Sequence, residues 1–137
     1  LGAMMAREEV AGSFGPGSHA STFGGNPVSC AAGLALLNAL LKDRVLKNCV
    51  QMGKYLVKGL DALKKRFPFV REIRGKGLLV GVELTIEGGK IAEACVKEGL
   101  LINCTASKVL RFAPPLTLKK SDVDRALNIL ETVLARQ

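Results

Sequence analysis

The sequence predicts an α/β fold in which helices pack against a small sheet. Helical periodicity dominates the first half of the chain, whereas short apolar and β-branched runs begin at Val70 and alternate with further helical segments. Strands that are separated by helices and followed by a terminal helix are typical of a helical layer on one face of a sheet. The 137 residues amount to about one domain, and 48% of them are hydrophobic, which is enough for a buried core.

The first predicted helix runs from about Pro27 to Leu41 and follows a glycine pair and a hydroxyl cluster. Asn26 suits the N-cap, and Pro27 suits the first helical position because its missing N–H would be unpaired there anyway. We expect free N–H groups and the positive end of the helix dipole at this terminus, with Ser21 and Thr22 as further donors. The pattern predicts a site for a phosphate or carboxylate, and a capped loop without a ligand is the alternative. The helix is apolar on nearly every side, so we expect most of its surface to be buried.

The second predicted helix runs from about Arg44 to Phe67 and is amphipathic, and Pro68 helps to end it. Spacings near three, four and seven residues give it one core stripe, while its lysines largely face water. The stripe comprises Leu46, Cys49, Leu56, Leu60 and Leu63, and the solvent face carries Lys47, Lys54, Lys58 and Lys65.

The rest of the chain is predicted to form four strands and two helices. Gly99 suits a helix C-cap, and Ser121 with Asp124 has the form of a capping box before the last helix. We expect strands over Val70 to Arg74, Gly77 to Leu84, Leu100 to Cys104 and Val109 to Phe112, and helices from about Lys90 to Glu98 and from Val123 to Ala135.

The net charge of +8 is concentrated in residues 42–76, which carry eleven Lys or Arg against three acids. A basic nucleic-acid-binding domain is therefore one hypothesis. The aromatic content of 4% leaves few stacking platforms, so we predict a solvated face, or one balanced by acids elsewhere, and no nucleic-acid partner. The most apolar run, Val28 to Leu41, is too short to cross a bilayer, and we predict no membrane partner.

The four cysteines do not have the spacing of a metal site. Cys30, Cys49, Cys95 and Cys104 include no pair with the short gap of a zinc knuckle, so we predict no metal. All four lie among apolar neighbours, as buried free thiols do in a reducing cytoplasm, and we expect a cytoplasmic protein. Asn103-Cys104-Thr105 matches a glycosylation sequon, but a three-residue pattern arises by chance.

Four ordered motifs resemble those of the class III pyridoxal-phosphate-dependent aminotransferases. The first is His19-Ala20-Ser21-Thr22-Phe23-Gly24-Gly25-Asn26-Pro27 with Cys30-Ala31-Ala32 after it. The others are Leu1-Gly2-Ala3-Met4, Arg74-Gly75-Lys76-Gly77-Leu78-Leu79 and Leu110-Arg111-Phe112-Ala113-Pro114-Pro115-Leu116. The resemblance covers essentially the whole chain and implies the C-terminal part of a fold-type I transferase.

The resemblance also implies a division into domains. Residues 1–42 would end the large pyridoxal-phosphate-binding domain, with the loop and helix that follow the Schiff-base lysine, and residues 43–137 would form the C-terminal small domain. In the family that lysine precedes the Gly-Ala-Met segment, and no lysine occurs here before Lys42. We therefore expect the lysine, the aspartate facing the pyridine nitrogen and the main phosphate-binding turn to lie upstream. On this expectation the chain holds no catalytic residue and is inactive alone.

Three residues receive binding roles through the resemblance. Thr22 would donate to the cofactor phosphate across a homodimer interface, Ser21 would lie at the substrate mouth, and Arg111 would bind the substrate α-carboxylate. A guanidinium suits this last task because it binds a carboxylate in bidentate fashion and stays charged. The alternative for Arg111 is a structural pair with a local acid. We expect structural roles for Arg74, beside the glycines, and for the single histidine, His19.

The leading functional hypothesis is transamination from N-acetylornithine to 2-oxoglutarate, a step of arginine biosynthesis. The sequence of the first motif favours this donor, although the same motif in relatives that use ornithine or 4-aminobutyrate differs at only a few residues. A non-catalytic binding module and the basic nucleic-acid-binding domain are the alternatives from other classes.

Overall fold

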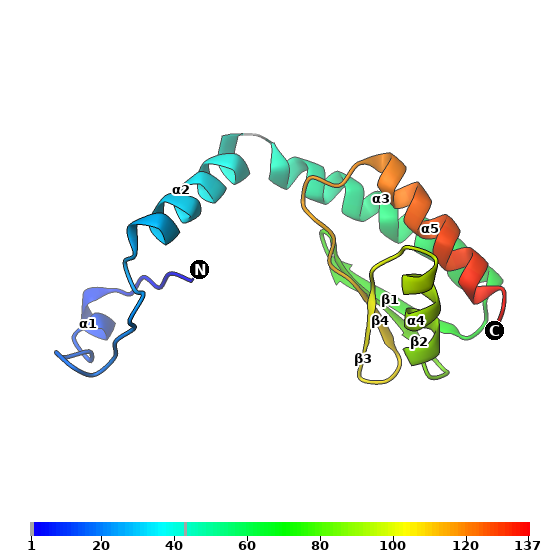
Figure 1. The fold of residues 1–137 in the computed structure, drawn as a ribbon, viewed down its shortest axis with the longest axis horizontal. Coiled ribbons are helices and arrows are strands. Elements are labelled where there is room, and N and C mark those ends of the chain that lie inside the picture. The colour runs from blue at the N-terminus through cyan, green and yellow to red at the C-terminus, as the bar shows by residue number, and fades with distance from the viewer. Residues whose placement is uncertain (1, 43) are drawn as a thin grey trace. The chain divides into compact units, whose positions relative to one another are not determined.

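The computed structural model describes residues 2–42 and 44–137, which fall into two compact units on either side of residue 43 (Figure 1). The first unit contains α1 (Glu8–Ala11) and α2 (Pro27–Lys42). The single turn of α1 was not predicted, because four residues are too few to reveal a helical period. The second unit contains α3 (Val45–Arg66), β1 (Val70–Lys76), β2 (Leu79–Leu84), α4 (Gly89–Lys97), β3 (Asn103–Thr105), β4 (Val109–Phe112) and α5 (Lys120–Leu134).

Helix α2 begins where the sequence predicted but is not buried in this chain. The Asn26 Oδ1 atom accepts hydrogen bonds from the N–H groups of Val28 (3.0 Å) and Ser29 (3.2 Å), so the predicted cap is confirmed. No residue of α2 is buried, and Leu34 remains 62% exposed. The expectation of a mostly buried helix is therefore wrong for the described residues. Apolar side chains on every side need covering layers, and residues 2–42 do not supply them.

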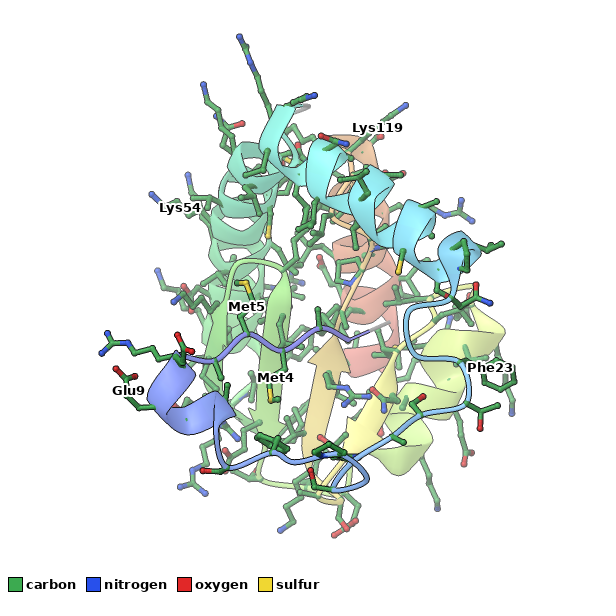
Figure 2. The ribbon with its side chains drawn as sticks, turned by 90° about the vertical axis from the view of Figure 1, so that its left-hand side faces the viewer. Met4, Met5, Glu9, Phe23, Lys54 and Lys119 are labelled. Carbon is green, nitrogen blue, oxygen red and sulfur yellow. The ribbon has the colours of Figure 1, made fainter. Side chains whose placement is uncertain are left out.

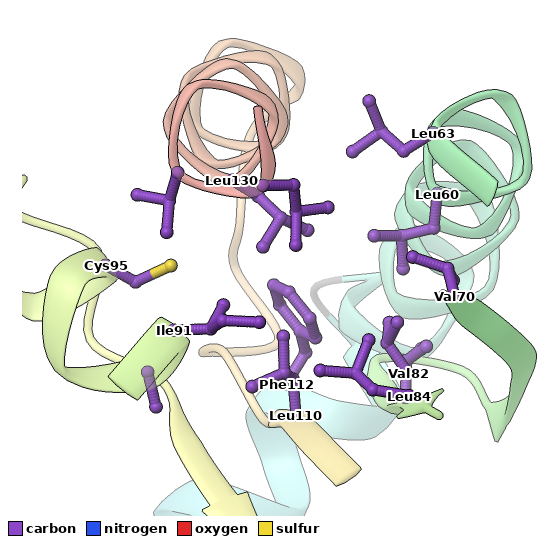
Figure 3. Close-up of a cluster of buried hydrophobic side chains, with 14 of the residues drawn as sticks. Leu60, Leu63, Val70, Val82, Leu84, Ile91, Cys95, Leu110, Phe112 and Leu130 are labelled. Atoms are coloured by element: carbon purple, nitrogen blue, oxygen red, sulfur yellow. The ribbon is translucent and has the colours of Figure 1, made fainter. Parts of the chain in front are cut away.

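The second unit is a four-stranded antiparallel sheet with the order β1-β2-β4-β3. Helices α3, α4 and α5 cover one face of the sheet, which confirms the predicted arrangement (Figure 3). Phe112 and Leu130 meet in the middle of the core between the sheet and α5. Other members of this core include Leu56 and Leu60 of α3, Val80, Val82 and Leu84 of β2, Ile91 and Cys95 of α4, and Leu110 of β4.

A β-bulge in β1 allows residues before and after it to pack on this core. The register changes from Val70 opposite Leu84 to Glu72 opposite Glu83, so Arg71 is the extra residue on β1. Without the bulge, Val70 and Glu72 would point to the same face, because side chains alternate along a strand. With it, Val70 and Ile73 both pack on the core, and Glu72 faces the uncovered side.

Several predicted boundaries differ from the structure. Strand β1 ends two residues later than predicted, at Lys76, and β2 begins two residues later, at Leu79. The strand expected over Leu100 to Cys104 is Asn103–Thr105, because Leu100 and Ile102 pack on the core from a loop. The predicted capping box of Ser121 and Asp124 does not form, and α5 starts three residues earlier than predicted, at Lys120. Asp122 Oδ2 accepts a hydrogen bond from the Lys119 N–H (2.9 Å) instead. Asp124 accepts one from the Tyr55 hydroxyl (2.6 Å), which ties α5 to α3.

Glycines allow the β1–β2 turn to lie directly on α3. Gly77 adopts a left-handed backbone with φ of +58° in this turn, and Gly53 of α3 lies against its carbonyl. A Cβ atom on Gly53 would lie 2.1 Å from the Gly77 oxygen, a distance that no packing tolerates. The Arg74-Gly75-Lys76-Gly77 segment thus ends β1 and enters a tight turn.

Replacing Gly53 by alanine should push the β1–β2 turn off the helix. The matched control is Gly59→Ala on the same helix, where the new Cβ meets only the flexible Leu127 side chain. Both changes gain the same helix propensity, so we expect Gly53→Ala to be less stable than Gly59→Ala by about 1 to 3 kcal/mol. Urea unfolding followed by circular dichroism measures this difference. Equal stability of the two variants would show that the turn is not packed as described.

Tyr55 is the single tyrosine of the chain, so its ionisation can be followed directly. The hydrogen bond to Asp124, with burial and the charge of the same carboxylate, raises the pKa of Tyr55 above its ordinary value of about 10. We expect an ultraviolet titration to give an elevated pKa and Asp124→Asn to lower it. Asp122→Asn, which removes a carboxylate of the same helix that does not touch Tyr55, should leave the pKa in place.

Candidate functional site

The Ser21–Thr22 segment forms an exposed turn before α2. The Gly24 N–H donates to the Ser21 carbonyl (3.2 Å), and the Asn26 N–H donates to the Phe23 carbonyl (3.2 Å). Phe23 is 78% exposed and points away from the ribbon (Figure 2). Within residues 2–42 and 44–137, neither the hydroxyl nor the N–H of Thr22 has a hydrogen-bond partner. Both groups can therefore donate to an anion.

The start of α2 does not provide the free N–H groups that the sequence suggested. Asn26 Oδ1 occupies the N–H groups of Val28 and Ser29, the Cys30 N–H donates to the Asn26 carbonyl (2.9 Å), and Pro27 has no N–H. The expectation of a helix-terminus anion site is wrong in this respect. The donors that remain for an anion belong to the turn, and they supply hydrogen bonds without a neutralising charge.

The uncovered face of the sheet carries the polar residues of the second unit. The strand register aligns Arg74, Gly81, Arg111 and Asn103 in one row across β1, β2, β4 and β3. Their neighbours along β4, Leu110 and Phe112, point to the covered face and are buried. Burial of these two side chains therefore fixes Arg111 on the open face.

Arg111 lies on this face with most of its donors free. Its Nε atom donates to Asn103 Oδ1 at 3.2 Å. No acid of the described part of the chain forms an ion pair with it, and no partner there accepts from its Nη1 or Nη2 atoms. Within residues 2–42 and 44–137, no acid pairs with Arg111, which argues against the alternative of a structural arginine in a local ion pair. Two parallel donors remain for a carboxylate.

Arg74, in contrast, forms ion pairs through its Nη1 atom. It pairs with Glu83 of β2 and with Glu72 (3.1 Å), while Arg71 pairs with the second oxygen of Glu83 (3.0 Å). The hydrogen bond to Glu83, helped by the charges of both carboxylates, raises the pKa of Arg74. The geometry agrees with the structural role expected for Arg74. The same pairing holds Glu83, a diagonal neighbour of Arg111 across β2 and β4, away from Arg111.

The segment after Arg111 is anchored to α3. Asn48 Nδ2 donates to the carbonyls of Leu116 (2.8 Å) and Leu118 (3.0 Å). An open, mainly apolar groove of about 430 Å³ runs beneath this segment, between Pro114 and α5. Arg111 is not among its lining residues, since its side chain lies on the other face of the sheet. The groove is therefore separate from the candidate carboxylate site.

Other candidate groups do not add a chemical site. His19 lies exposed in a bend. Burial raises the pKa of the Cys95 thiol to about 11, so this thiol stays protonated at neutral pH. Within the described ranges, no cluster of three His, Cys, Asp or Glu side chains could hold a metal ion. None of the described helices is both long enough and apolar enough to span a membrane.

Sequence reasoning missed Asn103, Glu83 and Asn48. The hairpin could have revealed Asn103, because the three-residue connection between β3 and β4 places Thr105 opposite Val109 and hence Asn103 opposite Arg111. Ala106 and Ser107 adopt positive φ angles in this connection, which the sequence did not signal with glycine. Glu83 and Asn48 act through contacts that are distant in sequence, and no local pattern marks them.

Comparison with known proteins gives a consistent result. The family model described as Aminotransferase class-III matches residues 1–134. The chain is 48% identical over 136 residues to the acetylornithine aminotransferase of Caldanaerobacter subterraneus, which covers 98% of this chain and 34% of that protein. It is 42% identical over 135 residues to the acetylornithine aminotransferase of Methanothermobacter thermautotrophicus, covering 98% of this chain and 35% of the relative.

Solved structures agree with the sequence relatives. The ornithine aminotransferase of Plasmodium yoelii superposes with a TM-score of 0.88 at 27% identity, over 96% of this chain and 36% of that one. The acetylornithine aminotransferase of Elizabethkingia anophelis gives 0.87 at 25% identity, over 97% and 36%. The chain spans about a third of the length of the curated relatives that it matches.

Proposed function

Because the chain belongs to the class III aminotransferase family, we propose that it supplies a substrate-carboxylate anchor and a cofactor-phosphate donor to a pyridoxal-phosphate-dependent aminotransferase. The reaction moves an amino group from N-acetylornithine to 2-oxoglutarate and serves arginine biosynthesis in the cytoplasm. Relatives named for acetylornithine at 42% and 48% identity support this donor. Residues 1–42 contribute to the cofactor-binding domain, and residues 43–137 are the small domain.

The observation that carries the proposal is the state of Arg111. Its guanidinium is on the uncovered face, its partner Asn103 is neutral, and its Nη atoms are free among the described residues. The α-carboxylate of 2-oxoglutarate lies next to the carbon that receives the amino group, so a bidentate anchor at Arg111 suits this half-reaction. Phe112 is buried and Asn48 anchors the following segment, which limits the movement of the strand that bears the guanidinium.

The turn before α2 provides hydrogen-bond donors for a phosphate group. The free hydroxyl and N–H of Thr22 can each donate to an anionic oxygen, and Ser21 adds a hydroxyl toward the substrate. Pyridoxal phosphate, when bound, takes up the electrons released as the carbon that bears the transferred amino group loses its proton. The residues of this chain orient the bound groups. Arg111 fixes the substrate carboxylate, and Thr22 fixes the cofactor phosphate. We propose that Thr22 serves the cofactor held by a second copy of the protein in a homodimer.

A second candidate reaction uses ornithine in place of its acetylated form. The fold similarity to the Plasmodium yoelii ornithine aminotransferase favours it, at lower identity than the acetylornithine relatives. Comparing kcat/KM for N-acetylornithine, ornithine and 4-aminobutyrate in the full-length protein separates the donors. A family match that includes the basic segment 42–76 disfavours the nucleic-acid hypothesis, and a DNA titration that showed a steep salt dependence would restore it.

Arg111→Lys in the full-length enzyme should impair the half-reaction with 2-oxoglutarate. A lysine retains the charge but cannot form the bidentate pair, so we expect kcat/KM for 2-oxoglutarate to fall about ten- to a hundred-fold. Affinity for the free cofactor should hardly change, because Arg111 contacts the substrate alone. Single-turnover kinetics of each half-reaction provide the measurement. If the half-reaction with 2-oxoglutarate keeps wild-type kinetics, Arg111 is structural and the proposed function loses its main support.

Thr22→Val should weaken cofactor retention. Valine has the shape of threonine without the hydroxyl, and losing one charge-assisted hydrogen bond costs about 1.5 to 3 kcal/mol. The cofactor dissociation constant, measured by absorbance after dialysis, should rise accordingly. Ser13→Ala, a change of another exposed hydroxyl in the same unit, is the control and should have no effect. Equal dissociation constants for Thr22→Val and wild type would end the assignment.

Mixing the two variants tests the contact across the interface. If Thr22 acts on the partner's cofactor and Arg111 on its own subunit's substrate, a hybrid of Thr22→Val and Arg111→Lys subunits contains one intact site and one doubly impaired site. Activity of the mixed dimers should therefore exceed that of either parent variant. If both residues act within their own subunit, each hybrid site carries one defect and mixing restores nothing.

A further inference from the structure

We propose that Asn103 is a positioning residue that orients the Arg111 guanidinium for the substrate α-carboxylate through a neutral hydrogen bond. This inference rests on the proposed function, because it concerns the same carboxylate anchor. The contact that carries it is the 3.2 Å hydrogen bond from Arg111 Nε to Asn103 Oδ1 across the β3–β4 pair. It occupies the donor at the side of the guanidinium and leaves the Nη1 and Nη2 donors at its end.

The chemistry of the partner matters as much as its place. An aspartate at this position would compete with a substrate carboxylate for the same cation, whereas an amide oxygen fixes the plane without cancelling the charge. The two acids on the open face, Glu72 and Glu83, are held by Arg71 and Arg74. Arg111 is thus oriented by a neutral group while its charge stays available.

Gly81 lies directly opposite Arg111 on β2, while Asn103 lies opposite it on β3. Gly81 has no side chain that could bond to the guanidinium, so the sheet orients Arg111 from the β3 side. A Cβ atom at position 81 would lie 3.2 Å from Cγ1 of Val109.

The test compares Asn103→Ala with Thr105→Val in the full-length enzyme. Thr105 lies on the same short strand and its hydroxyl contacts only the Val109 carbonyl (3.4 Å), so its removal controls for damage to the strand. We expect Asn103→Ala to raise KM for 2-oxoglutarate about five- to ten-fold with kcat nearly unchanged. Thr105→Val should leave both constants near wild type, and melting temperatures of the two variants should agree.

The half-reaction with the amino donor separates positioning from general damage. In N-acetylornithine the α-nitrogen is acetylated and the δ-amine is transferred, so the α-carboxylate lies far from the reacting carbon. The single-turnover kcat/KM of Asn103→Ala for this donor should therefore equal that of wild type. An equal loss in both half-reactions would overturn the inference and indicate a structural role. Asn103→Asp should raise KM for 2-oxoglutarate above the value for Asn103→Ala, and a wild-type KM in this variant would overturn the requirement for a neutral partner.

The outcomes separate this inference from the proposed function. If Arg111→Lys leaves the half-reaction with 2-oxoglutarate intact, the carboxylate anchor itself is wrong. If Arg111→Lys impairs it but Asn103→Ala behaves like Thr105→Val, the anchor stands and the positioning role of Asn103 is wrong. Nitrogen NMR of the Arg111 Nε–H group gives a readout without catalysis, since loss of the acceptor in Asn103→Ala should speed its exchange with water.

Discussion

The candidate carboxylate site depends on the burial of one face of a four-stranded sheet. Helices α3, α4 and α5 bury Leu110 and Phe112 of β4. Moving β4 by one residue would expose both of these side chains and bury a guanidinium. The free-energy penalty would exceed any local conformational preference. The orientation of Arg111 is therefore set by its apolar neighbours. The packing that stabilises the core also fixes which residues lie on the open face.

The open face separates two uses of positive charge. Arg71 and Arg74 surround Glu83, and the β1 bulge brings Arg71 to the position from which it reaches that carboxylate. Exposed ion pairs add little stability on their own. Here their consequence is electrostatic: they engage the acid that lies diagonally across from Arg111. Among the described residues, Arg111 thereby keeps its charge without an acidic partner.

Much of this architecture could be predicted from the sequence. Periodicity located α2, α3 and α5 to within a few residues and β4 at its observed bounds, because these segments have strong apolar patterns. The prediction for β3 was wrong because Leu100 and Ile102 are apolar and buried without being in a strand. The α5 cap was wrong because Asp124 is recruited by Tyr55, a residue distant in sequence. Arg111 was found from its motif, whereas its surroundings required the register of three strands.

The two units present their candidate groups in different physical settings. Thr22 lies in an exposed turn whose adjacent helix start is already capped by Asn26, so its hydroxyl can position an anion but cannot neutralise it. Arg111 lies on a sheet whose opposite face is packed, so its direction is fixed before any ligand arrives. A phosphate dianion held by Thr22 needs cationic or backbone donors from elsewhere, whereas a carboxylate finds a charged and oriented partner within residues 44–137. In the proposed function, the second unit accordingly carries the substrate anchor, and the first contributes an auxiliary contact.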